Sequence, residues 1–139
     1  MAAALDHYRH AIALGDRLAA VSPDDPQAPR DLSVSQDRIG DVLGAQGDGP
    51  GALAAYRQGL GIAEALAARD PANTQWQMDV VGSCARLGTL ASAQTVQLRR
   101  HYLLRGRAIL AELKGRDRLQ PGQDWIEWFD AQLAQLPTD

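Results

Sequence analysis

Residues 39–60 read IGDVLGAQGDGPGALAAYRQGL, and this stretch decides the fold. On both sides of its centre, apolar residues recur at intervals of three or four, which is the spacing of one face of an α-helix. The centre, residues 47–51, holds three glycines and a proline, residue types that end helices and form tight turns. The stretch therefore predicts two helices joined by a short turn.

The same pattern occurs more than once in the sequence. The string ALxxYR is present twice, with its copies 48 residues apart. Further residue pairs match at this offset: Leu14 with Ile62, Pro23 with Pro71, and Arg38 with Arg86. A third, decayed copy is marked by Ile109 and Trp125, at offsets of 47 from Ile62 and 49 from Trp76. An internal repeat of this length predicts a stacked array of equivalent helix pairs.

The rest of the sequence also favours helices and no strands. Aromatic residues make up only 5% of the total, alanine is abundant and β-branched runs are absent. Periodicity and turn residues predict helices over 2–21, 29–46, 50–69, 74–93, 97–114 and 121–136. Because no glycine or proline separates the fourth from the fifth, these two are either distinct or form one continuous or kinked helix.

The spacing within residues 39–60 resembles the tetratricopeptide repeat (TPR) signature. The residues that carry the resemblance are the Ile39-Gly40 pair, Leu43, Gly47, Ala52 and Tyr56. The resemblance implies an all-α, right-handed superhelical solenoid of antiparallel helix pairs with a C-terminal capping helix. The usual repeat has about 34 residues, and elongated copies like these resemble those of multidomain bacterial signalling proteins and of the kinesin light chain type.

On this basis residues 1–139 form a single TPR-like domain. Residues 1–21 are expected to be the second helix of an incomplete repeat, 29–69 the best repeat, 74–114 a degenerate repeat and 121–136 the capping helix. In the degenerate copy, Thr95, Arg100 and Leu104 replace Gly47, Ala52 and Tyr56. Because the sequence begins inside a repeat, we expect it to be the C-terminal part of a larger bacterial signalling or regulatory protein.

Composition excludes several classes of protein. The 14 Lys and Arg residues against 17 Asp and Glu give a net charge of −3, which argues against a general nucleic-acid binder. A single cysteine excludes a disulfide framework and a multi-cysteine zinc site. No apolar run approaches the roughly 20 residues of a membrane span, and no signal-peptide pattern is present. The sequence predicts a cytoplasmic protein without a membrane partner.

The resemblance also implies a site. In TPR proteins the first helix of each pair lines a concave groove that binds protein or peptide. The residues expected to face it are Val34, Asp37, Arg38, Asp41, Arg86 and Thr89. The like charges of Asp37 and Asp41, one turn apart, repel each other on an isolated helix. This favours a ligand on that face, the alternative being a solvated face without one.

One known mode of peptide binding is not expected. The carboxylate clamp of some TPR proteins uses a lysine and asparagines on the groove. Asp37 and Ala85 stand at the lysine position, and Asp41 and Thr89 at an asparagine position. The sequence therefore predicts an interaction scaffold that does not use this clamp.

A second candidate surface is basic. Segment 99–118 holds seven of the 14 cations against two acids, and its candidate basic patch comprises Arg99, Arg100, Arg105 and Arg107. Such a patch would bind nucleic acid or an acidic partner. Tyr102 is its one aromatic residue for base stacking, so nucleic acid is the less favoured partner. Pairing of these cations with acids elsewhere in the protein is the alternative.

No catalytic, cofactor-binding or metal site is expected. Cys84 lacks a nearby base and is interpreted as a small core residue. His7 and His10 share a helical face without a further metal ligand, so surface histidines are the favoured interpretation.

The two ends of the sequence bear further apolar residues. Trp125, Trp128 and Phe129 are expected to cover the last core face as a cap. Helix 2–21 bears apolar residues on more than one face, so it is expected to self-associate, most simply as a two-fold homodimer.

Overall fold

The computed structural model describes residues 2–138, and every regular element in that range is a helix. The helices are α1 (Ala2–Val21), α2 (Gln27–Ala45), α3 (Gly49–Arg69), α4 (Thr74–Thr89), α5 (Val96–Gly115) and α6 (Ile126–Gln135). The prediction of an all-α fold is confirmed.

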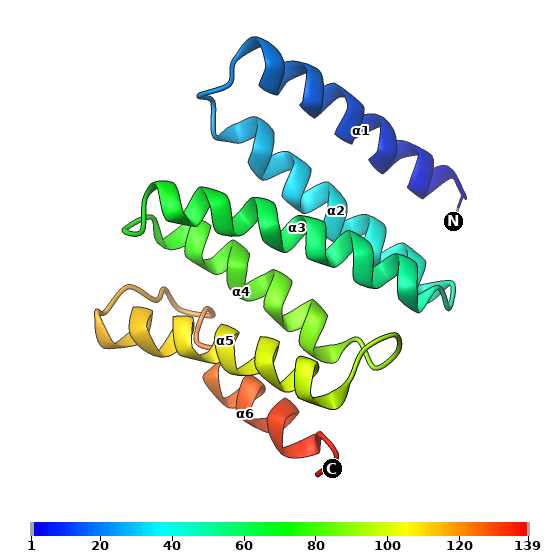
Figure 1. The fold of residues 1–139 in the computed structure, drawn as a ribbon. Helices are drawn as coiled ribbons and strands as arrows, with labels where there is room; N and C mark the ends of the chain where they lie inside the picture. The colour runs from blue at the N-terminus through cyan, green and yellow to red at the C-terminus, as the bar shows by residue number, and fades with distance from the viewer. Residues whose placement is uncertain (1, 139) are drawn as a thin grey trace.

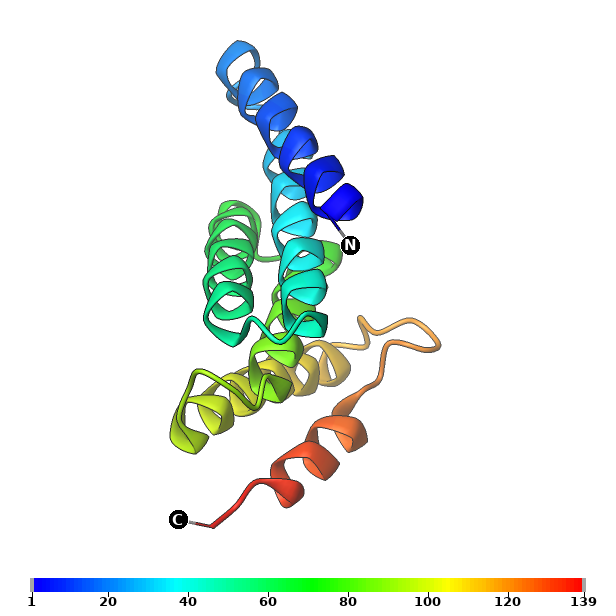
Figure 2. The same ribbon diagram turned by 90° about the vertical axis from the view of Figure 1, so that its right-hand side faces the viewer.

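The helices are stacked in sequence order. Each packs on the helix before it and the helix after it, from α1 at one end to α6 at the other. Successive helices run in opposite directions, so the backbone zigzags through the stack (Figures 1 and 2). This arrangement puts α2 and α4, the first helices of the two predicted repeats, close enough for their side chains to pair.

Three helices begin at a capping side chain. Asp48 accepts a hydrogen bond from the backbone N–H of Gly51 at the start of α3, at 2.9 Å. Asn73 and Thr95 cap α4 and α5 in the same way, each at 3.1 Å. Because these side chains satisfy backbone donors that the helix leaves unpaired, they fix where each helix starts.

The fourth and fifth predicted helices are separate. α4 ends at Thr89, four residues before the predicted end of 74–93, and Ala93 has a positive φ of 68°. The side-chain amide of Gln94 folds back and donates to the carbonyl oxygens of Leu87 and Leu90. Gln94 thus caps the last turn of α4, which explains why the helix stops without a glycine or proline.

The predicted capping helix 121–136 begins later than expected, at Ile126. Gly122 has a φ of 85°, and the backbone N–H of Gln120 donates to the side chain of Gln123 at 2.8 Å. The indole N–H of Trp125 donates to the carbonyl of Gly122 at 2.9 Å. Residues 120–125 therefore form a turn closed by side chains, and the helix starts only after it.

The internal repeat is visible in the packing of the helix pairs. A Cβ atom at Gly40 would lie 2.3 Å from the ring of Tyr56, and one at Gly88 would lie 2.4 Å from Leu103. The glycines are 48 residues apart, but their partners are 47 apart. Leu103 is fully buried whereas Leu104 is 50% exposed, so Leu103 takes the place of Tyr56. The predicted equivalence of Leu104 and Tyr56 is wrong by one residue.

A second contact repeats at the other end of each pair. Arg69, at the end of α3, donates to the backbone carbonyl of Asp24 at 3.1 Å. Arg118, just after α5, donates to the carbonyl of Ala72 at 3.0 Å. Each arginine ties the end of its pair to the loop that precedes the first helix of that pair.

Of the three aromatic residues in the predicted C-terminal cap, only Phe129 has a fully buried side chain. Phe129 is completely buried, and its ring lies where a Cβ atom at Gly106 would stand, 2.7 Å away. Leu136 is also buried and packs in the same cluster. Trp125 and Trp128 remain 46% and 38% exposed, so the prediction that all three aromatics cover the core is wrong for these two.

Candidate functional site

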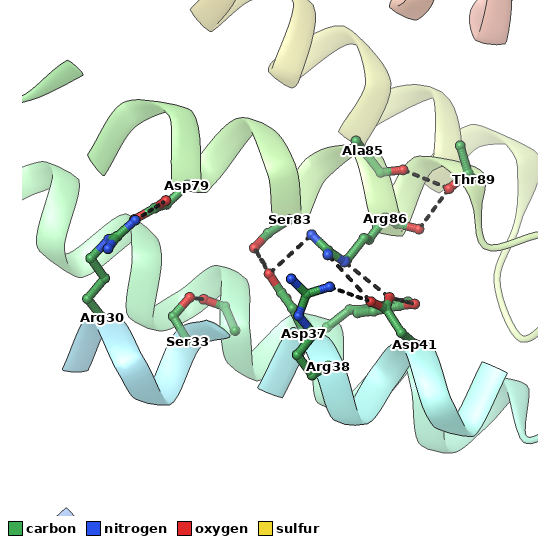
Figure 3. A network of polar contacts seen from close by, with 12 residues as sticks. Arg30, Ser33, Asp37, Arg38, Asp41, Asp79, Ser83, Ala85, Arg86 and Thr89 are labelled. Carbon is green, nitrogen blue, oxygen red and sulfur yellow. Dashed lines mark hydrogen bonds and ion pairs between the residues drawn. The ribbon is translucent and has the colours of Figure 1, made fainter. Parts of the chain in front are cut away.

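The predicted groove residues lie where α2 faces α4. Figure 3 shows Asp37, Arg38 and Asp41 of α2 and Arg86 of α4 pointing toward one another in one network of polar contacts. Val34 and Thr89 flank the network. The structure therefore brings together four of the six residues singled out in the sequence.

Arg86 joins the two acids of α2. Its Nε donates to Asp41 Oδ1 at 3.1 Å, and its Nη2 lies 3.4 Å from Asp41 Oδ2. Its Nη1 lies 3.7 Å from Asp37 Oδ2. A cation between two carboxylates offsets the repulsion between them. The like-charge pair is thus stabilised within the protein and does not by itself indicate a ligand.

Asp37 faces the protein interior. It is 8% exposed, and the hydroxyl of Ser83 donates to its Oδ2 at 3.0 Å. Burial raises the pKa of Asp37 to about 6, although Arg86 and the Ser83 hydrogen bond oppose that rise. A Cβ atom at Gly59 of α3 would lie 2.5 Å from Asp37 Oδ1, so three helices enclose this carboxylate. Asp37 therefore presents little exposed surface to the α2–α4 face.

Asp41 is more exposed, but its oxygens are already engaged. The phenol of Tyr56 donates to Asp41 Oδ1 at 2.7 Å, from the same ring that packs on Gly40. Burial, together with this bond to a carboxylate, raises the pKa of Tyr56 above its usual value. Asp41 thus links the close contact between α2 and α3 to the polar face between α2 and α4.

The remaining predicted residues lie at the edge of the network. The hydroxyl of Thr89 donates to the carbonyl of Ala85 within its own helix at 2.8 Å. Val34 is 42% exposed and makes no polar contact through its side chain.

Sequence reasoning missed three contacts on this face. Arg30 Nε donates to Asp79 Oδ2 at 2.8 Å, and the hydroxyl of Ser33 donates to the carbonyl of Gly59 at 2.8 Å. The third is the bond from Ser83 to Asp37. All three join residues at least 26 positions apart, so no local pattern could have revealed them.

A depression of about 140 Å³ opens between α2 and α4 beside this network. Its lining residues are Ser33, Val34, Asp37, Arg38, Met78, Asp79, Gly82 and Arg86. The guanidinium of Arg86 lies over Gly82, where a Cβ atom would stand 3.7 Å from Nη1. The absence of a side chain at Gly82 keeps the depression open below that guanidinium.

The side chains of the predicted basic patch are engaged within the protein, two of them by acids and two by backbone carbonyls. Arg105 pairs with Glu64 at 2.9 Å, and Arg107 pairs with Asp130 of α6. Arg99 and Arg100 donate to the carbonyls of Gly88 and Pro137. The other cations of segment 99–118 also have partners: Lys114 with Asp124, Arg116 with Glu112, and Arg118 with Ala72. These contacts agree with intramolecular pairing, the alternative left open by the sequence.

The other candidate residues form no site with one another. Cys84 is completely buried, and burial raises the pKa of its thiol to about 12. The imidazole of His7 lies edge-on to the neighbouring Tyr8 ring, with centroids 5.5 Å apart. Within residues 2–138, no group of three or more His, Cys, Asp or Glu side chains could hold a metal ion. No helix in that range is long and apolar enough to cross a bilayer.

Comparisons with protein-family models, with curated proteins and with solved structures found no match for this protein.

Proposed function

We propose that this protein is a TPR-like helical solenoid that binds a protein or peptide partner along the α2–α4 face, as a scaffold without catalysis of its own. The observation that carries the proposal is the network joining Asp37, Asp41 and Arg86 beside an open depression. Side chains held in place before binding lose little conformational freedom when a partner arrives. We also propose, from the resemblance, that the solenoid is part of a bacterial signalling or regulatory protein in the cytoplasm.

A photo-crosslinking residue at position 34 tests this proposal. Val34 is exposed at the rim of the depression. The same residue placed at Gln58, which lines a separate cavity between α1, α2 and α3, is the matched control. We expect a discrete crosslinked partner in lysate of the source organism at position 34 alone, and calorimetry with the purified partner then measures its affinity. Equal labelling from both positions, or none from either, contradicts the proposal.

A second candidate function, self-association through α1, is favoured by a separate observation. Leu14, Leu18 and Val21 are 44%, 61% and 82% exposed. Their spacing puts them along one side of α1. An exposed apolar stripe of this kind is typical of a helix that packs on another. We propose that two copies meet through this stripe, as a two-fold dimer.

Sedimentation equilibrium tests the dimer. Changing Leu14 and Leu18 together to Gln should shift the equilibrium toward monomer. Leu104→Gln, on α5, removes a leucine of similar exposure and should leave it unchanged. A wild-type protein that stays monomeric at tens of micromolar contradicts the dimer but leaves the scaffold proposal intact. Nucleic-acid binding is not proposed, because Arg105 and Arg107 are already paired with acids of the protein, and Arg99 and Arg100 donate to its backbone carbonyls.

A further inference from the structure

The α2–α4 face has more free hydrogen-bond donors than acceptors. Both oxygens of Asp41 accept: Oδ1 from Tyr56 and Arg86, and Oδ2 from Arg86. Asp79 is held by Arg30, and Asp37 by Ser83. The acids on this face are therefore already supplied with donors.

Arg38 differs from these residues. Its side chain is 52% exposed, and its one ion pair within residues 2–138 is a contact of 3.7 Å between Nη1 and Asp41 Oδ2. That distance is too long for a hydrogen bond. A guanidinium has five N–H donors and no acceptor. Arg38 thus offers several donors at the rim of the depression, and Arg86 Nη1 adds another over Gly82, 3.7 Å from Asp37 Oδ2.

The depression suits a small acidic group on an aliphatic stem. Arg38 and Arg86 supply positive charge, and Val34 and Met78 supply apolar wall. Two acids, Asp37 and Asp79, also line it, but they already accept from Ser83 and Arg30. At about 140 Å³ the space is of side-chain size. Planar guanidinium groups match a carboxylate with parallel N–H···O bonds, which makes such pairs strong and directional.

We propose that this depression binds a carboxylate of the partner, with Arg38 and Arg86 donating to its oxygens and Val34 and Met78 contacting the carbons next to it. The inference rests on the proposed function, since it names the chemical group that the α2–α4 face recognises. Aspartate and glutamate side chains and the C-terminus of a peptide share this chemistry.

Binding of the carboxylate is coupled to a proton on Asp37. Asp37 lines the same depression and faces charged or titratable groups from three helices: Asp41 of α2, Tyr56 of α3, and Asp79 and Arg86 of α4. Its pKa, about 6 without ligand, rises further when another carboxylate arrives, because like charges disfavour ionisation. The partner carboxylate remains largely ionised at pH 6, since its usual pKa is about 4.

Affinity therefore increases as pH falls from 8 to 6. Each unit by which the ligand raises the Asp37 pKa tightens binding by up to about tenfold. Binding independent of pH would contradict this coupling.

The experiment is a nuclear magnetic resonance titration of the arginine Nε–H signals with short peptides. The probes are acetylated pentapeptides with two glycines on each side of a central residue. The first has glutamate at the centre and an amidated end, so its side chain is its one carboxylate. The second replaces glutamate with glutamine. The third has glutamine at the centre and a free C-terminus. We expect saturable shifts at Arg38 and Arg86 with the first or third probe and none with the second, which identifies the source of the carboxylate.

Variants separate this site from general charge effects. Arg38→Gln should weaken binding by about tenfold or more, as expected for the loss of a charge-assisted hydrogen bond. Arg57→Gln removes one exposed cation from α3 and should have no effect. Asp37→Asn should still bind but lose the pH dependence, and the wild-type pH series provides the same readout should that variant not fold.

Equal shifts from the glutamate and glutamine peptides, or no shift with any probe, would overturn the inference. Its failure is distinguishable from failure of the proposed function. A partner that crosslinks at position 34 and binds Arg38→Gln as tightly as wild type leaves the scaffold standing and removes the carboxylate site. If the probe peptides bind but no partner crosslinks at position 34, the carboxylate site stands and the scaffold proposal fails.

Discussion

The ring of Tyr56 lies against Gly40 so closely that a Cβ atom there would stand 2.3 Å from Cε1. The phenol of the same ring donates to Asp41, the neighbour of Gly40, at 2.7 Å. One side chain thus sets the distance between α2 and α3 and also orients an acid on the α2–α4 face. Packing of the helix pair and geometry of the candidate site are therefore linked through Tyr56.

Replacing Gly40 by alanine should destabilise the protein by about 1–3 kcal/mol, because the added methyl group collides with a ring that is buried and held by its hydroxyl. Urea unfolding measures the loss. Gly44→Ala, one turn later in α2, is the control: its Cβ would lie 3.8 Å from Ala52. The free energy of unfolding of that variant should be unchanged or higher by up to about 1 kcal/mol, because alanine has a higher helix propensity than glycine. Similar losses for both variants would contradict the close contact.

Truncating Tyr56 to alanine should cost about 3–5 kcal/mol, as for large aromatic residues in protein cores. Tyr56→Phe keeps the ring and removes only the hydrogen bond to Asp41, so we expect about 1–3 kcal/mol. Thermal or urea denaturation of the pair separates packing from hydrogen bonding. A loss below roughly 0.5 kcal/mol for the alanine variant is typical of a surface position and would show that the ring is not in the core.

Asp37 should make the stability depend on pH. Its pKa is about 6 in the folded state against an ordinary 3.8, so the folded state holds this proton more tightly. The resulting stabilisation is complete below about pH 4 and is lost as pH rises through 6. The difference in unfolding free energy between wild type and Asp37→Asn should change by up to about 3 kcal/mol between pH 4 and 8.

The control for this titration is Asp31→Asn, which removes an exposed carboxylate from the same helix. Its unfolding free energy should follow that of wild type across the pH range. Parallel curves for wild type and Asp37→Asn would mean that Asp37 titrates as an ordinary exposed acid.

The thiol of Cys84 should react slowly with a colorimetric disulfide reagent at pH 8. It has no exposed surface, and burial raises its pKa to about 12, so almost no thiolate is present. Absorbance follows the reaction, and the same protein in denaturing urea gives the rate of the exposed thiol. A native rate equal to that of the unfolded protein would contradict the buried position.

Much of the fold follows from local sequence signals. The glycines and proline of residues 47–51 mark the turn between α2 and α3, and the capping residue Asp48 lies among them. The end of α4 has no such marker, since the side chain of Gln94 supplies the cap from a distance. The start of α6 at Ile126 depends in the same way on side chains that close the preceding turn.

The candidate site was only partly accessible to sequence reasoning. Periodicity places Asp37 and Asp41 on one side of a helix, and the repeat resemblance puts Arg86 on the same groove, but neither predicts the bond from Arg86 to Asp41, 45 residues away. The pairing depends on how α2 and α4 are oriented. The shift of one residue between Leu103 and Leu104 has a similar origin, because the capping residues Asp48 and Thr95 are 47 positions apart, as Tyr56 and Leu103 are, whereas the glycines they pack on are 48 apart.

Stacking in sequence order also has a consequence for how the protein is made. Each helix packs chiefly on its immediate neighbours in the sequence, so most contacts close short loops, and proteins with such local contacts fold quickly. When a helix pair leaves the ribosome, each of its helices can already pack on the other, and this packing does not require distant segments of the sequence. Arg69 and Arg118 each complete their own pair by binding the loop in front of it. Because these contacts lie within one pair and the loop before it, the order in which the pairs form can follow the order in which they are synthesised.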